Sequence, residues 1–184
     1  MTDAVVKVGG SLLDDNDALS RTLSALEIIA PAHALVIVPG GGPFADAVRA
    51  VDRRHNLSSD DAHWMAILGM EQFAIALASR IRNAELVHGS ADISRAQTRA
   101  RIPVLAPYRW LRESDPLPHS WDVTSDSIAA WIASEIGAPQ LILIKPDAHD
   151  ALTAVDRYFD RARAPSLKYS ILTPAMLTGD WFPG

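Results

Sequence analysis

The sequence contains no cysteine among its 184 residues. Disulfide bonds and thiolate chemistry, whether nucleophilic or metal-binding, are therefore excluded. Histidine could still bind a metal, but the six histidines are scattered and no two of them stand four residues apart. We therefore predict no metal site built from protein side chains.

Long apolar segments and clusters of positive charge are also missing. No segment is long and apolar enough to cross a bilayer, and Met1 leads into the first apolar run without a basic signal-peptide region. The formal net charge is −5 at pH 7 and no basic run is present, which argues against a nucleic-acid surface. We expect a cytoplasmic protein that binds small molecules or protein partners, and neither nucleic acid nor membrane.

Lysine is scarce. Only Lys7, Lys145 and Lys168 occur among the 17 basic residues, and the rest are arginines. Each lysine is therefore a stronger candidate than usual for a position that needs a compact ammonium group, although codon bias could produce the same scarcity.

Apolar, β-branched runs alternate with helical periodicity along the chain, which is typical of an α/β protein. With 48% hydrophobic residues the chain can bury a substantial core, and we predict one domain over residues 1–184, an α/β three-layer αβα sandwich with a mainly parallel sheet. The predicted strands are 4–8, 34–38, 85–88, 102–106, 140–145 and 168–172. The predicted helices are 16–30, 44–55, 59–82, 91–99, 125–136 and 151–162, with an irregular loop at 107–122 and a last turn at 174–178.

Two glycine turns directly follow apolar runs and are the most informative feature. The first is Gly9-Gly10-Ser11, with Lys7 two residues ahead of it, and the second is Gly40-Gly41-Gly42-Pro43. Glycine lets backbone N–H groups converge on an anion beside a helix N-terminus, so the pair predicts a phosphate site. Turn geometry alone can also place glycine pairs after strands. Neither turn matches the P-loop or the dinucleotide-binding pattern.

Residues 121–133 form a second informative segment. Thr124, Ser125 and Asp126 stand at a predicted helix start, where capping is the simplest role. The strand that follows this helix ends at Lys145. Ligands bind at the carboxyl edge of parallel sheets, so an acid and a second lysine are expected to meet there.

These motifs together resemble the amino acid kinase superfamily. The resemblance rests on Lys-x-Gly-Gly-Ser at 7–11, Pro-Gly-Gly-Gly-Pro-Phe-Ala at 39–45 and Ser-Asp-x-x-Ala at 125–129. Within the superfamily, residues 62–66 and 121–129 are most similar to the aminomethylfuranyl-methanol phosphate kinases of methanofuran biosynthesis and their methylotroph relatives.

The resemblance implies ATP-dependent phosphoryl transfer with Mg²⁺ to a small-molecule acceptor, most simply a phosphate monoester. It assigns catalysis to Lys7, Asp126 and Lys145, with Asp126 orienting the lysines. ATP binding falls to Gly9, Gly10, Ser11 and Lys145. Acceptor binding falls to Gly40, Gly41, Gly42, Thr124 and Ser125.

Two alternatives to this function stay open. The acceptor could be an amino acid or a carboxylate, or the protein could be a non-catalytic nucleotide-binding or sensor protein on the same fold. A later Gly-Gly-Met…Lys stretch, which supplies a second catalytic lysine in several larger family members, does not occur in this sequence. Either Lys145 takes that role or the site works with Lys7 and Mg²⁺ alone.

The helix predicted at 59–82 is apolar over more of its circumference than one core stripe needs. Such a helix is either fully buried or shared with a partner. Because the resemblance implies that related kinases pair through this helix, we expect a homodimer with two-fold symmetry.

Overall fold

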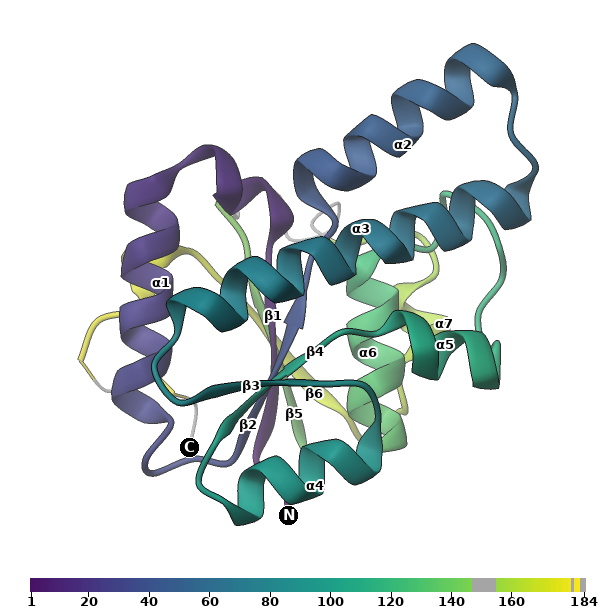
Figure 1. Ribbon diagram of the computed structural model, residues 1–184. Helices are drawn as coiled ribbons and strands as arrows, with labels where there is room; N and C mark the ends of the chain where they lie inside the picture. The colour runs from purple at the N-terminus through teal and green to yellow at the C-terminus, as the bar shows by residue number, and fades with distance from the viewer. Residues whose placement is uncertain (147–154, 180, 183–184) are drawn as a thin grey trace.

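The computed structural model describes residues 1–146, 155–179 and 181–182. Its centre is a parallel sheet of six described strands in the order β3-β4-β2-β1-β5-β6 (Figure 1). These strands are β1 (Ala4–Val8), β2 (Leu35–Pro39), β3 (Ala84–Val87), β4 (Ile102–Leu105), β5 (Gln140–Ile144) and β6 (Lys168–Leu172). All five pairings are parallel, as expected where helices connect the strands.

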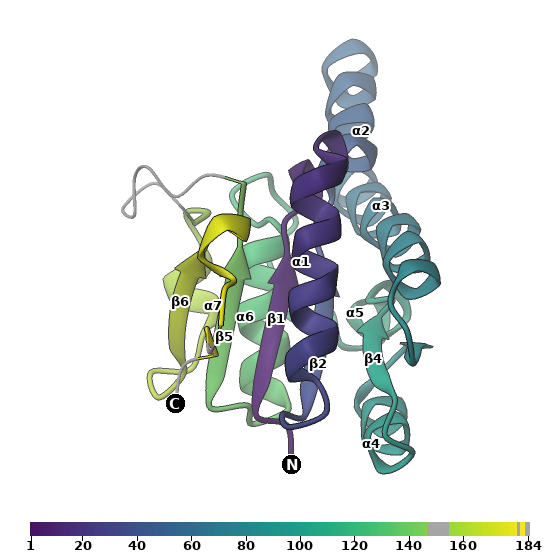
Figure 2. The ribbon, with the colours of Figure 1, turned by 90° about the vertical axis from the view of Figure 1, so that its left-hand side faces the viewer.

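Helices cover both faces of the sheet (Figures 1 and 2). One face packs against α1 (Asn16–Ile29), the C-terminal half of α3 (Ser59–Arg80) and Leu177, which directly follows the short turn η2 (Pro174–Met176). The other face packs against α4 (Ser90–Thr98), α5 (Tyr108–Ser114), α6 (Ser125–Glu135) and α7 (Phe159–Ala162). The three-layer α/β sandwich predicted from the sequence is therefore confirmed.

Side-chain alternation along β1 places Lys7 on the α6 side of the sheet. Ala4, Val6 and Val8 contribute to the core under α1, whereas Val5 contributes to the core under α6. Successive side chains of a strand point to opposite faces, so Lys7 shares the face of Val5. Lys7 is only 5% exposed. A lysine is almost never buried to this extent unless it is paired with an acidic group.

Helix α2 (Gly42–His55) pairs with α3 in a hairpin at the carboxyl edge of the sheet, where β1 and β2 end (Figure 1). Pro43 lies in the first turn of α2, and the Ser58 hydroxyl accepts from the Asp61 N–H to begin α3. A Cβ at Gly69 would lie 3.1 Å from the Cβ of Phe44, so this glycine lets the two helices approach closely.

Three elements differ from the predictions. The stretch 107–122 is not a continuous loop, because it contains α5 between Pro107 and Asp115. The prolines of this stretch lie outside the helix, and Leu111 buries its side chain in the core. The first glycine turn leads into the 3₁₀ helix η1 (Gly10–Asp14) rather than directly into α1.

The helix predicted at 151–162 is the third difference. Its first part lies outside the described residues, and residues 155–158 form a bend and a turn. Helix α7 is therefore only the four residues Phe159–Ala162. No helix in the described part of the chain is long and apolar enough to span a membrane.

Candidate active site

Lys7, Asp126 and Lys145 meet at the carboxyl edge of the sheet. Lys7 Nζ lies 2.9 Å from Asp126 Oδ1, and Lys145 Nζ lies 2.6 Å from Asp126 Oδ2. The three residues come from β1, from the second position of α6 and from the residue after β5. One carboxylate thus holds two ammonium groups side by side, the juxtaposition that the sequence predicted.

The two lysines control the charge of Asp126. Burial alone raises the pKa of this carboxyl group, but the charges of Lys7 and Lys145 outweigh it and hold the pKa below its ordinary value. Asp126 therefore stays ionised, and the cluster carries one net positive charge. Such a cluster attracts a phosphate group and keeps the lysines in fixed positions for it.

The two glycine turns pack against each other. A Cβ at Gly10 would lie 2.1 Å from the backbone nitrogen of Gly42, and a Cβ at Gly40 would lie 2.4 Å from that of Gly10. Gly42 also has a positive φ of 52°, a conformation that favours glycine. The close approach of the two backbones therefore requires glycine at these positions, whether or not a ligand binds there.

The backbone amides of Gly9 and Gly40 are engaged in hydrogen bonds within the sheet edge. The Gly9 N–H donates to the Ile144 carbonyl at 2.8 Å, and the Gly40 N–H donates to the Val8 carbonyl at 2.8 Å. These amides link neighbouring strands, so they are not available to a phosphate while the bonds last. Any ligand contact at Gly9 or Gly40 would have to use other atoms, and the ligand-binding roles of these two residues stay predictions.

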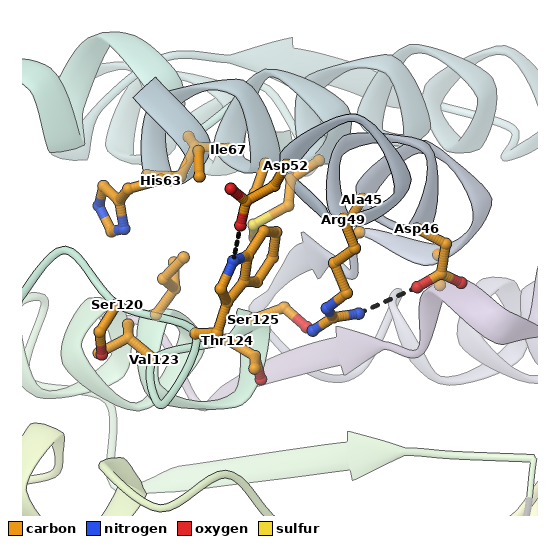
Figure 3. A pocket seen from close by; sticks show the side chains of 18 of the residues that line it. Ala45, Asp46, Arg49, Asp52, His63, Ile67, Ser120, Val123, Thr124 and Ser125 are labelled. Atoms are coloured by element: carbon orange, nitrogen blue, oxygen red, sulfur yellow. Dashed lines mark hydrogen bonds and ion pairs between the residues drawn. The ribbon is translucent and has the colours of Figure 1, made fainter. Parts of the chain in front are cut away.

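A cavity of about 510 Å³ opens between α2, α3 and the start of α6 (Figure 3). Six predicted ligand-binding residues line it, namely Gly10, Ser11, Gly41, Gly42, Thr124 and Ser125. The N-termini of α2 and α6 both face it, and helix N-termini favour anions. Its inner wall is apolar and includes Ala62, Ala66, Ile67, Met70, Val123 and Ile128. Lys7, Asp126 and Lys145 do not line this cavity, although Asp126 directly follows Ser125.

Asp156 holds the N-terminus of α6 in place, and sequence reasoning missed it. Its carboxylate accepts from the N–H and the hydroxyl of Thr124, at 2.9 and 2.7 Å, and from the N–H and the hydroxyl of Ser127. Thr124 is the N-cap of α6, as predicted, but it also depends on this distant acid. A lone aspartate in a weakly periodic stretch carries no sequence signal for such a role.

Trp121 and Arg49 form one wall of the cavity and were not predicted as site residues. The indole Nε1 of Trp121 donates to Asp52 at 2.7 Å, the bond drawn in Figure 3. The guanidinium carbon of Arg49 lies 4.6 Å from the centre of the Trp121 ring. The cavity therefore has an anchored aromatic group with a cation stacked on it.

A pair of stacked histidines lies at the far end of the cavity. His63 lines the cavity and stacks on His119, with ring centres 4.2 Å apart. Both ring nitrogens of His119 lie on carboxylates, 2.6 Å from Asp60 and 2.8 Å from Asp115. Since neither nitrogen needs to accept, His119 fits the doubly protonated form. The contacts of His119 with His63 and Asp60 connect the N-terminus of α3 to the segment that precedes Trp121.

The two histidines have opposite pKa shifts. Burial, reinforced by the neighbouring His119, lowers the pKa of His63 to about 4. Burial also acts to lower the pKa of His119, but the hydrogen bonds to Asp60 and Asp115 outweigh it and raise the pKa above its ordinary value. Near neutral pH the cavity side of the pair is therefore uncharged.

The described residues offer no group of three or more acidic or histidine side chains that could hold a metal ion. The one buried carboxylate of the cluster, Asp126, is already paired with two lysines. These residues do not fit a protein-bound Mg²⁺.

Comparison with known proteins agrees with the fold and the motifs. The model of the amino acid kinase family matches residues 4–163. The [5-(aminomethyl)furan-3-yl]methyl phosphate kinase of Methanocaldococcus jannaschii is 32% identical over 159 residues, which are 85% of this chain and 68% of that protein.

Solved structures with the same fold are also kinases. The uridylate kinase of Archaeoglobus fulgidus superposes with a TM-score of 0.62 at 20% identity, over 79% of this chain and 64% of that one. The UMP kinase of Ureaplasma parvum gives 0.64 at 19% identity, over 80% and 70%. The aspartate kinase of Synechocystis gives 0.60 at 13%, over 78% of this chain and 28% of that one. The present chain thus spans less than two thirds of the archaeal uridylate kinase.

Proposed function

The chain belongs to the amino acid kinase family, and from this premise we propose that it is an ATP-dependent kinase that converts a small phosphate monoester to a diphosphate. The observation that carries the proposal is the Lys7–Asp126–Lys145 cluster beside a cavity faced by two helix N-termini. The relative named above acts on an aminomethylfuranyl-methyl phosphate. A monoester of that kind, used in the biosynthesis of a C1-carrier cofactor, is our first candidate acceptor.

The cluster supplies what phosphoryl transfer requires. An oxygen of the acceptor phosphate attacks the γ-phosphorus of ATP, the bond from that phosphorus to the β–γ bridging oxygen breaks, and ADP leaves. Little covalent help is needed, so catalysis consists of positioning and charge neutralisation. Lys7 and Lys145 would neutralise the transferring group, and Asp126 would keep the two ammonium groups apart and oriented. A monoester dianion needs no general base.

The cavity suits the acceptor better than it suits ATP. The predicted acceptor residues Gly41, Thr124 and Ser125 line its polar part, whereas Ala62, Ile67 and Met70 line an apolar part that suits a small organic group. We place the acceptor phosphate at the polar part and its organic body in the apolar part. ATP would approach from the Lys145 side and bring Mg²⁺ with its own phosphates.

Other parts of the proposal concern the whole molecule. We keep the predictions of one domain over residues 1–184, a homodimer and a cytoplasmic location, with a small-molecule acceptor and no nucleic-acid or membrane partner. The alternative acceptor is an amino acid or another carboxylate. The alternative function is nucleotide binding without transfer.

An ADP-release assay separates these functions. Purified protein with ATP and Mg²⁺ is given phosphate monoesters that include the aminomethylfuranyl-methyl phosphate, and in parallel amino acids and simple carboxylates. We expect ADP release only with monoesters, and phosphorus NMR should identify a diphosphate product. Release with carboxylates alone would select the alternative acceptor, and ATP binding without any release would select the non-catalytic function.

A further inference from the structure

Arg49 is the one lysine or arginine among the described residues that line the cavity. The other ionisable side chains there are Asp46, Asp52 and His63, and the lowered pKa of His63 leaves it neutral near pH 7. A cavity that accepts a phosphate monoester therefore has one permanent positive charge in its wall.

The position of Arg49 is set by its neighbours. Its guanidinium stacks on Trp121 at 4.6 Å and lies 2.9 Å from Asp46. The Trp121 ring is fixed in turn by Asp52, whose other carboxylate oxygen accepts from the Leu57 N–H at 3.1 Å. Figure 3 shows the Arg49 side chain extending from α2 toward Ser125, at the start of α6. The stacking draws the arginine over the cavity rather than leaving it as an ordinary surface ion pair.

The reaction needs a cation for each of its two phosphate groups. Transfer from ATP to a monoester brings two anionic phosphates together. Lys7 and Lys145 share the Asp126 carboxylate, so these three residues together carry at most one net positive charge for the transferring group. The acceptor phosphate needs a separate cation. A planar guanidinium is well suited to it because its donors match two phosphate oxygens at once.

We propose that Arg49 binds the phosphate of the acceptor and that Trp121 is the positioning residue for its guanidinium. The proposal rests on the proposed function, since it takes the acceptor to be a phosphate monoester. Asp46 is exposed and exchanges its arginine partner for water when the acceptor arrives. Arg49 thereby selects phosphorylated acceptors over the corresponding alcohols.

Arg49→Gln tests the assignment, with Arg54→Gln as the matched control. Arg54 lies on the same helix, is exposed and does not line the cavity. We expect Arg49→Gln to raise the KM for the monoester about tenfold or more, the effect of losing a charge-assisted hydrogen bond. The KM for ATP should stay within about twofold, and Arg54→Gln should match the parent protein. Arg49→Lys keeps the charge without the planar fork and should fall between the two.

Trp121 is tested by the same assay. Trp121→Leu removes the platform and should raise the KM for the monoester with kcat within about twofold, because only the placement of Arg49 changes. Trp121→Phe keeps a ring and should restore part of the loss. Equal KM values for Arg49→Gln and Arg54→Gln, or an equal rise for monoester and ATP, would overturn the proposal.

A binding measurement separates this proposal from the proposed function. Inorganic phosphate is titrated calorimetrically into the parent protein and both arginine variants without ATP. We expect binding to the parent and to Arg54→Gln, and at least about fivefold weaker binding to Arg49→Gln. Equal binding to all three, or none to the parent, would remove Arg49 from anion binding. Failure of every monoester to release ADP would instead reject the proposed function, and the titration would still decide the role of Arg49.

Discussion

The lysines of the candidate active site are held in position by a shared acidic partner. Lys7 is buried within a strand and Lys145 follows another, yet both reach the same carboxylate on α6. A buried lysine is costly unless it is paired, and here two lysines pair with one carboxylate. Residues with that arrangement are suited to an anionic ligand.

Lys7→Ala should abolish phosphoryl transfer while the fold stays intact, because a lysine on the transferring group acts chiefly in the transition state. We expect kcat to fall about a hundredfold or more, the scale seen for single electrostatic donors. Steady-state kinetics with the acceptor found by the ADP-release assay measure the loss. Lys168→Ala, which removes the exposed lysine of β6, is the control. Turnover within a few-fold of the parent would remove Lys7 from the mechanism.

His119 predicts a pH-dependent contribution to stability. Its pKa is raised in the folded protein, so its ion pairs with Asp60 and Asp115 stabilise the fold fully below the unfolded pKa and are lost as the pH rises through the folded pKa. His119→Gln should therefore lower the Tm more at about pH 6 than at about pH 9. Thermal melts of both proteins across this range measure the difference. If the Tm difference between the parent and His119→Gln stays constant or grows as the pH rises, His119 is not stabilised in its charged form.

His63 acts in the opposite direction. Its lowered pKa means that the unfolded chain binds a proton more readily, so stability falls as the pH drops from about 6.5 toward about 4. In acid, protonated His119 therefore stabilises the fold, whereas protonation of His63 destabilises it. Because the two rings stack, both effects act at the N-terminus of α3.

At the scale of elements, the site depends on where helices begin. Helix α2 begins at the second glycine turn and α6 begins at Thr124, and both N-termini face the cavity. Helix α6 also carries Asp126 in its first turn. Any shift of the start of α6 therefore moves the acid that holds the two lysines.

Asp156→Ala should destabilise the protein by about 1–3 kcal/mol, because four donors at the start of α6 lose their acceptor. Chemical denaturation measures the loss. Asp160→Ala is the matched control, since the ion pair that Asp160 makes with Arg163 is exposed and is worth little. Equal stability of the two variants would show that Asp156 does not support α6.

The glycine turns show why an element cannot be tested by one substitution alone. A Cβ at Gly41 would lie 2.4 Å from the Cβ of Ala45. A larger residue there would disturb the start of α2 as well as fill the cavity. Gly41 is therefore a poor probe of the acceptor site, and Arg49 is a better one.

At the scale of the whole molecule, some apolar side chains of α3 are buried in the protein and others remain exposed to solvent. Ile67, Phe73 and Leu77 are buried in the two cores, which explains much of the apolar character of the helix. Leu68 and Ile75 stay 41% and 59% exposed. They are seven residues apart, so they lie on one face of the helix.

We predict that this face forms the homodimer contact. Leu68→Ser combined with Ile75→Ser should convert a dimer into a monomer without unfolding it, because both side chains are exposed in the single chain. Light scattering at micromolar concentration measures the mass. Ile28→Ser, on the exposed side of α1, is the control and should leave the dimer intact. A parent mass near the single-chain 19.9 kDa would reject the dimer.

The sequence by itself determined the order of the elements and the identity of the charged cluster. Apolar β-branched runs separated by helical patterns can pair only through crossovers, which imposes a parallel sheet. Lys7, Asp126 and Lys145 could be predicted to meet because strand ends and helix starts converge at one edge of such a sheet. Helix α5 was missed because prolines on both sides of it obscured a short helix whose stability comes from burying Leu111.

Only the tertiary structure decided the rest. The Gly9 amide bonds to Ile144, Asp156 caps a helix that begins 31 residues earlier, and Arg49 stacks on a tryptophan 72 residues away. None of these contacts has a local pattern, because each joins groups that are distant in the chain and close only after the sheet and helices have packed. Periodicity reports which face of an element is buried, whereas the partner that a polar side chain finds depends on the packed geometry of the whole molecule.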